Sequence, residues 1–220
     1  MKENDYITSI LIVGSGEDFK PEKIKKLAQE AQLIIAGDGG ANALSKIGFF
    51  PDILIGDMDS ISKDVLEKMP ETCEIFRYPQ AKDYSDSELC IKKALEYQPQ
   101  KITLAAVTGT YIDHTLTNLL SLFTMTDGNT KIEIVTSNST IFLITPQMPA
   151  KMNGMNGRRF SFFPFESITG LIMEGFYYHF SGNSLRQWDY SLSNVINNDT
   201  ALLAFETGKG MGILFDENYS

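Results

Sequence analysis

The stretch LIIAGDGGANALSKI, residues 33–47, decides the fold. It opens with a short apolar run, Leu33 to Ala36, of the kind that forms a buried strand. A glycine-rich turn follows, and from Gly39 to Ile47 the sequence predicts a helix. A strand that leads through such a turn into a helix is half of a βαβ unit.

The same alternation of apolar runs and amphipathic stretches continues on both sides. Strands that alternate with helices indicate a mostly parallel, Rossmann-like sheet covered by helices on both faces. We predict strands at residues 10–13, 33–36, 53–55, 74–77, 102–107 and 131–136, and helices at 21–30, 39–47, 63–69, 86–97 and 114–125.

The pattern changes near Ser137. Beyond it the β-rich segments are separated by clusters of Gly, Pro and Asn, and no helical period is present, which is typical of a small all-β sandwich or barrel. We therefore expect an α/β domain over residues 1–136 and a β domain over residues 137–220. The predicted strands of the second domain are residues 140–144, 159–163, 168–174 and 201–205.

The amino-acid composition limits which kinds of partner the protein can bind. The formal net charge of −9 argues against nucleic acid, because phosphate contacts need Lys and Arg. The two cysteines, Cys73 and Cys90, form no C-x-x-C motif, which favours a reduced, cytoplasmic protein. The polar N-terminus lacks a signal-peptide core, and no apolar run approaches the ~18–20 residues of a membrane helix. We expect no nucleic-acid or membrane partner.

Acidic residues follow four of the predicted strands. Because the carboxyl ends of parallel strands meet at one edge of a sheet, these acids should form one cleft that holds Mg²⁺ and a polyphosphate. The motifs are GDGGAN at 37–42, GDMDS at 56–60, KDYSDSE at 82–88 and TGTYIDH at 108–114.

The GDMDS motif favours a metal site. Asp57 and Asp59 would repel each other and raise each other's pKa, and a divalent cation removes that cost. A solvated acidic turn is the alternative.

The other motifs also have structural readings. Asp38 and Asp113 could each cap the following helix. Ser85 and Glu88 fit a capping box, and a lone His114 is most often a half-buried structural residue. Lys82 could pair with a phosphate.

The usual nucleotide motifs are missing. No P-loop occurs, since the only similar segment, residues 208–210, lacks the spacing and the hydroxyl. The segment Gly14-Ser15-Gly16 has Phe19 where a dinucleotide fingerprint needs its third glycine, so we interpret it as a simple glycine turn. A P-loop kinase and a standard NAD enzyme are disfavoured.

These motifs, in this order, resemble the signature of thiamine pyrophosphokinases. The resemblance spans nearly the whole chain. It rests on DGGAN at 38–42, GDMDS at 56–60, KDYSD at 82–86, Asp113-His114 with Asn118, GFYY at 175–178 and Ser193-Asn194.

The resemblance implies an enzyme that uses Mg²⁺ and ATP to place a diphosphate on the hydroxyl of thiamine, giving thiamine diphosphate and AMP. It implies a homodimer with active sites between subunits. Trp188 is a second candidate for a thiamine contact, with packing in the β domain as the alternative. The implied metal ligands are Asp57, Asp59 and Asp86, and Asp38 contributes to the same site. Lys82 and Asp113 join them in catalysis, with either Asp86 or Asp113 as proton acceptor. The implied nucleotide-binding residues are Asp38, Gly39, Gly40, Asn42, Ser60, Ser85, Tyr111 and His114. The implied thiamine-binding residues are Tyr178, Ser193 and Asn194.

Two positions depart from the family pattern. Ser85 stands where the family usually has a threonine, which preserves the hydroxyl, and the second change is at the arginine position. The family shows Gly-Gly-Arg-x-Asp-His where this chain has Thr110-Tyr111-Ile112-Asp113-His114, so Tyr111 replaces an arginine. Lys82, Arg158 and Arg159 are candidates for the missing positive charge. Three other readings stay open: a different Mg²⁺-dependent phosphotransferase or hydrolase, a non-catalytic nucleotide or vitamin sensor, and a structural protein without a site.

Overall fold

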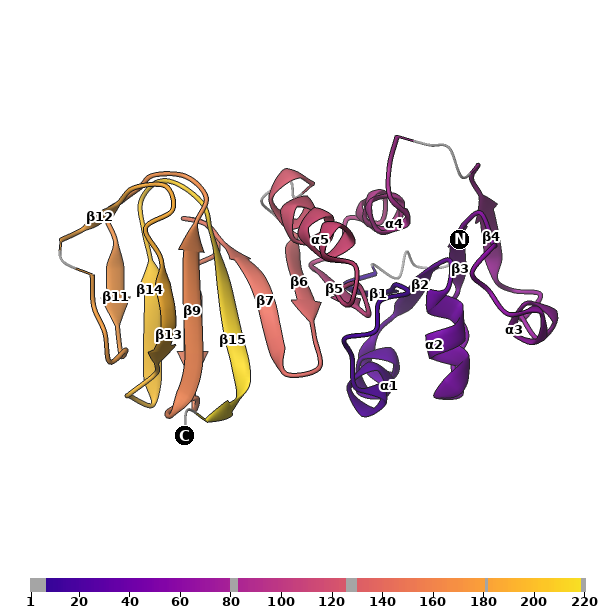
Figure 1. The fold of residues 1–220 in the computed structure, drawn as a ribbon, viewed down its shortest axis with the longest axis horizontal. Coiled ribbons are helices and arrows are strands. Elements are labelled where there is room, and N and C mark those ends of the chain that lie inside the picture. The colour runs from indigo at the N-terminus through magenta and orange to yellow at the C-terminus, as the bar shows by residue number, and fades with distance from the viewer. Residues whose placement is uncertain (1–6, 80–82, 126–129, 181, 219–220) are drawn as a thin grey trace, which may run out of the picture. The chain divides into compact units, whose positions relative to one another are not determined.

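The computed structural model describes residues 7–79, 83–125, 130–180 and 182–218. The chain forms two compact units, Met1–Ser137 and Asn138–Ser220 (Figure 1). The boundary expected after residue 136 falls one residue before this division.

The first unit is built on a parallel sheet. Its strands are β1 (Ser9–Val13), β2 (Leu33–Gly37), β3 (Ile53–Gly56), β4 (Glu74–Arg77), β5 (Lys101–Ala105) and β6 (Lys131–Val135). They lie in the order β6-β5-β1-β2-β3-β4, and every neighbouring pair is parallel. The chain therefore proceeds from β1 toward one edge through β2, and later passes β1 to fill the other side with β5. This makes the gap between β1 and β5 a topological switch point.

Helices cover both faces of this sheet. Figure 1 shows α1 (Pro21–Glu30) and α2 (Gly40–Lys46) on one side and α4 (Asp86–Leu95) and α5 (Ile112–Thr124) on the other, with α3 (Lys63–Glu67) after β3. Ile24 of α1 and Leu44 of α2 pack with Leu11 and Val13 of β1. On the other face α4 buries one side, which includes Cys90. Burial of these strands on both faces explains their uninterrupted apolar sequence.

The second unit is antiparallel. Its strands are β7 (Ser139–Ile144), β8 (Ala150–Asn153), β9 (Arg158–Pro164), β10 (Ile168–Thr169), β11 (Ile172–Glu174), β12 (Ser184–Leu185), β13 (Ser191–Val195), β14 (Thr200–Ala204) and β15 (Gly210–Asn218). They form sheets in the orders β13-β9-β15-β7 and β11-β14-β8, and the pair β10-β12. Phe160 and Phe162 of β9 meet Leu203 of β14 in one core. The predicted fold class, a parallel α/β sheet followed by antiparallel strands, is confirmed.

Several element bounds differ from the prediction. The strand expected at 168–174 is two strands, because Gly170 turns the chain with a φ of 66° between them. Helix α5 begins at Ile112, two residues before the expected start. Strands β8, β12, β13 and β15 were not predicted, since they are short or carry glycines and polar residues that hide their alternation.

Candidate active site

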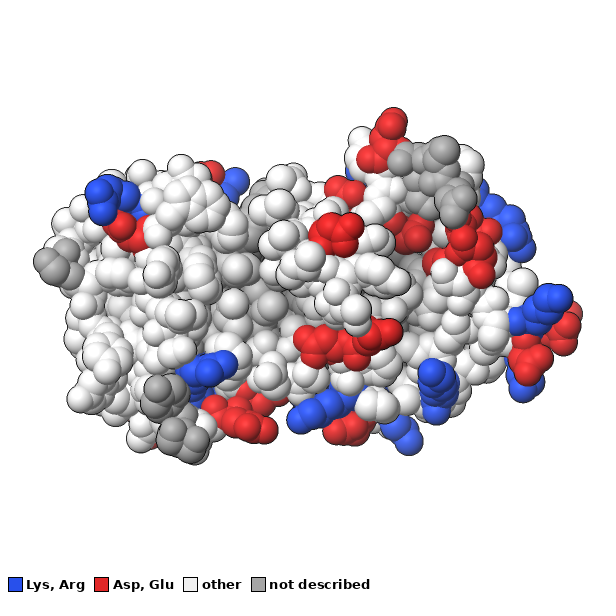
Figure 2. Space-filling model, viewed as in Figure 1, with Lys and Arg blue, Asp and Glu red and all other residues white. Residues whose placement is uncertain are grey.

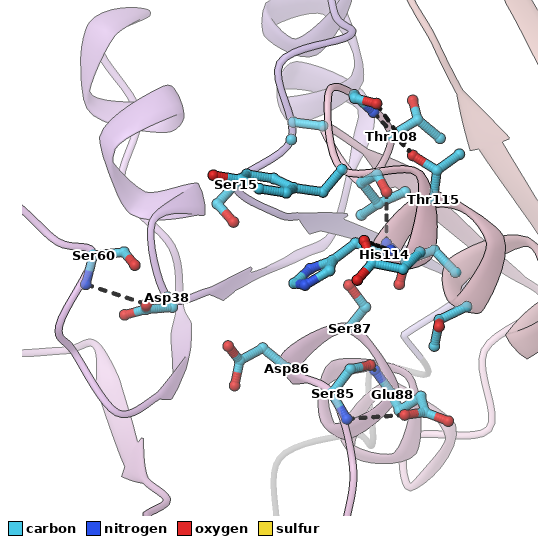
Figure 3. Close-up of a pocket in the computed structure, with 18 of the residues that line it drawn as sticks. Ser15, Asp38, Ser60, Ser85, Asp86, Ser87, Glu88, Thr108, His114 and Thr115 are labelled. Atoms are coloured by element: carbon cyan, nitrogen blue, oxygen red, sulfur yellow. Dashed lines mark hydrogen bonds between the residues drawn. The ribbon is translucent and has the colours of Figure 1, made fainter. Parts of the chain in front are cut away.

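A cleft of about 720 Å³ lies at the carboxyl ends of the parallel strands. The loops after β1, β2, β3 and β5 and the start of α4 line it, so each of the four predicted motifs contributes. Figure 3 shows Asp38 and Ser60 on one side of the cleft and His114, Thr108 and Thr115 on the other. Its acidic lining residues are Glu17, Asp38, Asp57, Asp59, Asp83, Asp86, Glu88 and Asp113.

Three of these carboxylates converge. Asp38, Asp57 and Asp59 each offer one oxygen, and these oxygens lie within 4.8 Å of one another. The family resemblance implies Asp86 as the third metal ligand beside Asp57 and Asp59, with Asp38 contributing to the same site. The structure places Asp86 at the start of α4, where it lines the same cleft outside this group.

The loop after β3 turns sharply to bring Asp57 and Asp59 together. Met58 has a φ of 69°, a left-handed conformation that costs a bulky residue of order 1 kcal/mol, while its side chain packs against the core. The Asp59 N–H donates to Asp57 Oδ1 at 3.1 Å, and Ser60 Oγ donates to Asp59 Oδ1 at 2.9 Å. The packed Met58 side chain therefore holds two like charges on one side of the loop.

Asp38 is the most constrained of the three. It is 5% exposed and has a φ of 41°. Its Oδ2 accepts the Ser60 N–H at 3.3 Å, whereas Oδ1 is buried without a hydrogen-bond partner among the described residues. Burial raises the pKa of Asp38 above its ordinary value, the Ser60 hydrogen bonds oppose this, and the charges of Asp57 and Asp86 add to it. A buried, unsatisfied carboxylate oxygen beside two other acids is a position that a cation would stabilise.

Backbone packing keeps Asp38 and the loop after β3 close. Gly56 has a φ of 154°, and a side-chain carbon there would lie 2.8 Å from Asp38 Cβ. Asn42 spans the same gap: its Nδ2 donates to Ser60 O at 2.8 Å and its Oδ1 accepts the Ser62 N–H at 3.0 Å. Both ends of the Asn42 amide therefore hold the loop that carries Ser60. The contact of Asn42 with the nucleotide stays a prediction.

Gly39 and Gly40 place α2 against the first strand. The residue before the helix is Gly39, and no side chain caps α2, so the alternative reading of Asp38 as a cap is wrong. Gly40 lies so close to Val13 O that a side chain would not fit. Because Gly40 has no side chain, α2 can pack closely against β1 beside the cleft.

The predicted capping box of α4 is confirmed. Ser85 Oγ accepts the Glu88 N–H at 3.2 Å, and Glu88 Oε2 accepts the Ser85 N–H at 2.9 Å. Both residues line the cleft (Figure 3). Lys82 lies outside the described residues.

The loops after β1 and β5 form one wall. Gly16 N–H donates to Ala106 O at 2.6 Å, and Thr110 Oγ1 donates to Glu17 Oε2 at 2.6 Å. Sequence reasoning interpreted Gly14-Ser15-Gly16 as a simple turn and missed Ser15 and Glu17, which line the cleft. The glycines after the first strand were the available signal.

Tyr111, Asp113 and His114 lie at the start of α5 and line the same cleft. The helix begins after Tyr111 without a side-chain cap, so Asp113 is not a cap; its Oδ1 accepts the His114 N–H at 2.9 Å. His114 is exposed rather than half-buried. Asn118 Nδ2 donates to Val107 O at 2.6 Å and ties α5 to the loop after β5.

The cleft has almost no positive charge. None of its described lining residues is Lys or Arg, and His114 is the one side chain among them that can become cationic. Figure 2 shows several Asp and Glu side chains gathered around the loops near α4 and β4. A polyphosphate would be repelled here without added cations, and the hard oxygen ligands of Asp38, Asp57 and Asp59 fit Mg²⁺.

The remaining predicted residues lie in the second unit. Asn194 is fully buried, and its amide accepts the Tyr178 N–H at 2.9 Å and donates to Tyr178 O at 2.7 Å. Ser193 has a φ of 55° and donates its N–H to Ser161 Oγ at 3.0 Å. Tyr178 is 62% exposed. Trp188 is also exposed and packs edge-on against a neighbouring phenylalanine ring.

The candidate cation residues Arg158 and Arg159 also lie in the second unit and have partners there. Arg158 donates to Phe215 O and pairs with Asp216, and the Arg159 guanidinium lies 3.5 Å from the centre of the Phe215 ring.

Comparison with known proteins gives consistent matches. The family model described as thiamin pyrophosphokinase, catalytic domain, matches residues 24–135. Thiamine pyrophosphokinase of Bacillus subtilis (strain 168) is 30% identical over 170 residues, which cover 76% of this chain and 79% of that protein.

Solved structures extend the likeness to both units. The crystal structure of thiamine pyrophosphokinase from Bacillus subtilis superposes with a TM-score of 0.81 at 25% identity, covering 96% of this chain and 100% of that one. Thiamin pyrophosphokinase from Candida albicans has a TM-score of 0.78 at 19% identity, covering 96% and 91%, and supports the fold alone. None of the helices in the described part of the chain has the length and the hydropathy that a membrane span requires.

Proposed function

This chain belongs to the thiamine pyrophosphokinase family, and we propose that it transfers the diphosphate group of ATP to the hydroxyl of thiamine, giving thiamine diphosphate and AMP. The observation that carries the proposal is the convergence of Asp38, Asp57 and Asp59 in a cleft lined by all four signature motifs. Phosphoryl-type transfer needs positioning and charge neutralisation more than covalent help, and this cleft offers both.

We further propose that Mg²⁺ is the ion these carboxylates hold, with Asp86 completing the site from α4. Bound there, Mg²⁺ would neutralise phosphate oxygens of ATP and keep the donor in line for attack. The buried Oδ1 of Asp38 and the lack of Lys and Arg among the described lining residues support this assignment. Asp86 and Asp113 both line the cleft, and the acceptor for the hydroxyl proton is one of these two carboxylates.

Thiamine, which accepts the diphosphate, would bind to residues of the second unit. The exposed ring of Tyr178 offers an aromatic face to the cationic thiazolium of thiamine. Asn194 would act by holding the backbone of Tyr178 in place, since its amide is engaged there. Ser193 is the adjacent polar contact. We also propose a homodimer, in which these residues of one subunit reach the cleft of the partner subunit. A cytoplasmic location is the last part of the proposal.

The test exchanges two carboxylates for amides. Asp57→Asn and Asp59→Asn, made together, remove two negative charges with little change in shape. We expect thiamine-dependent AMP release in Mg²⁺ to fall about 1,000-fold or more, because several kcal/mol of charge stabilisation are lost. The assay follows AMP and thiamine diphosphate together.

Asp64→Asn is the matched control. Asp64 lies in the first turn of α3, is exposed and does not line the cleft, so its exchange should leave turnover unchanged. Undiminished turnover in the double variant would exclude the metal assignment. Release of ADP instead of AMP would identify a different phosphotransferase, and ATP binding without turnover would identify a sensor.

A further inference from the structure

Tyr111 is an exposed aromatic residue inside a polar cleft. Its side chain lines the cleft and is 73% exposed, the highest value among the exposed large hydrophobic side chains of the described chain. Its ring centre lies 5.7 Å from that of His114, at an interplanar angle of 42°. The apolar face of this ring is available for a ligand, and stacking on such a face is a common way to hold a nucleobase.

The position of Tyr111 in the fold indicates which ligand it meets. It ends the loop after β5, and this loop is hydrogen-bonded to the loop after β1 through Gly16 and Glu17. These two loops lie at the topological switch point, where open α/β sheets bind nucleotides. Figure 3 shows Ser15, Thr108 and His114 around the same part of the cleft.

The acidic group lies on the other side of the switch point. Asp38 follows β2, and Asp57 and Asp59 follow β3. The same cleft continues from this group to the loops after β1 and β5, where Tyr111 lies, so it offers room there for the nucleoside of a nucleotide whose phosphates a cation holds. No described lining residue offers an ammonium or guanidinium group on this wall. Among the described residues of this wall, the rings of Tyr111 and His114 are the aromatic faces on which a base could stack.

We propose that Tyr111, with His114 beside it, is the stacking platform for the nucleobase of the nucleotide donor. This role deepens the proposed function, on which it rests. The aromatic face of Tyr111 would take the place of the charged contact that the family arginine makes. Every nucleobase can stack on such a face, and the affinity would rise with the stacking strength of the base.

The test compares Tyr111→Leu and Tyr111→Phe with the wild type by calorimetry, using Mg²⁺-ATP and Mg²⁺-triphosphate without thiamine. We expect Tyr111→Leu to weaken ATP binding about 5- to 150-fold and to leave inorganic triphosphate unchanged, because only ATP carries a base. Tyr111→Phe keeps the ring and should bind ATP within about threefold of the wild type.

Tyr190→Leu is the matched control. Tyr190 is an exposed tyrosine of the second unit, 60% exposed, and it is not among the described residues that line the cleft. We expect this variant to bind ATP like the wild type. Equal losses for ATP and triphosphate in Tyr111→Leu would overturn the proposal, and so would unchanged ATP binding.

Turnover separates this inference from the proposed function. If Tyr111→Leu raised the KM for thiamine and left ATP binding intact, the ring would serve the acceptor and the inference would be wrong. Absence of AMP production by the wild type would refute the proposed function. The comparison of ATP binding with triphosphate binding would still show whether Tyr111 stacks on the nucleobase.

Discussion

Asp38 and Glu133 are two carboxylates of the same unit that the fold buries almost equally and treats in opposite ways. They are 5% and 6% exposed. Glu133, on β6, lies 2.7 Å from Lys101 Nζ and 3.2 Å from Lys131 Nζ and accepts a hydrogen bond from Thr103. Asp38 lies among other acids, and its Oδ1 has no hydrogen-bond partner in the described part of the chain.

The pKa values of the two groups move in opposite directions. Burial raises the pKa of Asp38 and works in the same direction on Glu133, but hydrogen bonds and charges from Lys101 and Lys131 outweigh it there and lower the pKa of Glu133. A buried acid with two lysine partners stabilises the fold by itself, whereas a buried acid among acids leaves charge for a ligand to neutralise. The contrast is between a carboxylate whose charge the chain itself neutralises and one that we propose a cation neutralises.

The largest effect that sharpens this contrast is expected from Asp38→Asn. Turnover should fall about 100-fold or more, because one ligand charge is lost from the cation site. The melting temperature should stay the same or rise, because a neutral amide removes the repulsion and can still accept the Ser60 N–H. Thermal unfolding and AMP release measure the two effects. Near-normal turnover would show that Asp38 is not needed to hold the cation and has a structural role.

A smaller effect is expected from the cation itself. Mg²⁺ at about 100 times its Kd should stabilise the wild type by about 2.7 kcal/mol, because it binds the folded chain alone. EDTA should reverse the shift in melting temperature, and the variant with Asp57→Asn and Asp59→Asn should show none. An equal shift in that variant would mean that the ion binds elsewhere.

The smallest effect is expected from Glu133→Gln. We expect a loss of about 1–2 kcal/mol in the free energy of unfolding at pH 7, less than for a fully buried pair because Lys101 and Lys131 remain 40% and 56% exposed. KM values for both substrates should not change. Urea unfolding and steady-state kinetics measure these quantities.

The pH dependence of this loss has a definite sign. The pKa of Glu133 is lower in the folded chain than its ordinary value of 4.5, so its stabilisation is present above that pH and is lost as pH falls through the folded value. The gap between wild type and Glu133→Gln should therefore narrow below about pH 4.5. A gap independent of pH would show that packing, rather than the ion pairs, carries the effect.

Much of the molecule could be predicted because its signals are local. Strands such as Leu33–Gly37 are apolar without interruption, and the Ser85–Glu88 capping box is written in four consecutive residues. The second unit was harder, since strands such as β13 and β15 gain their pairing from residues far away in the chain. The acids at the strand ends followed from topology, because parallel strands present their carboxyl ends at one edge.

The sequence by itself determined the succession of strands and helices in the first unit, the four acidic motifs and the family. The tertiary structure decided which carboxylate oxygens converge: those of Asp38, Asp57 and Asp59 lie within 4.8 Å of one another, while Asp86 lines the cleft from α4. It also showed that the amides of Asn42 and Asn194 hydrogen-bond to backbone groups, and that the loop of Ser15 and Glu17 lines the cleft. The physical reason is that residue type and spacing set local conformation, whereas the direction of a side chain depends on loop turns such as Met58 and on partners distant in sequence.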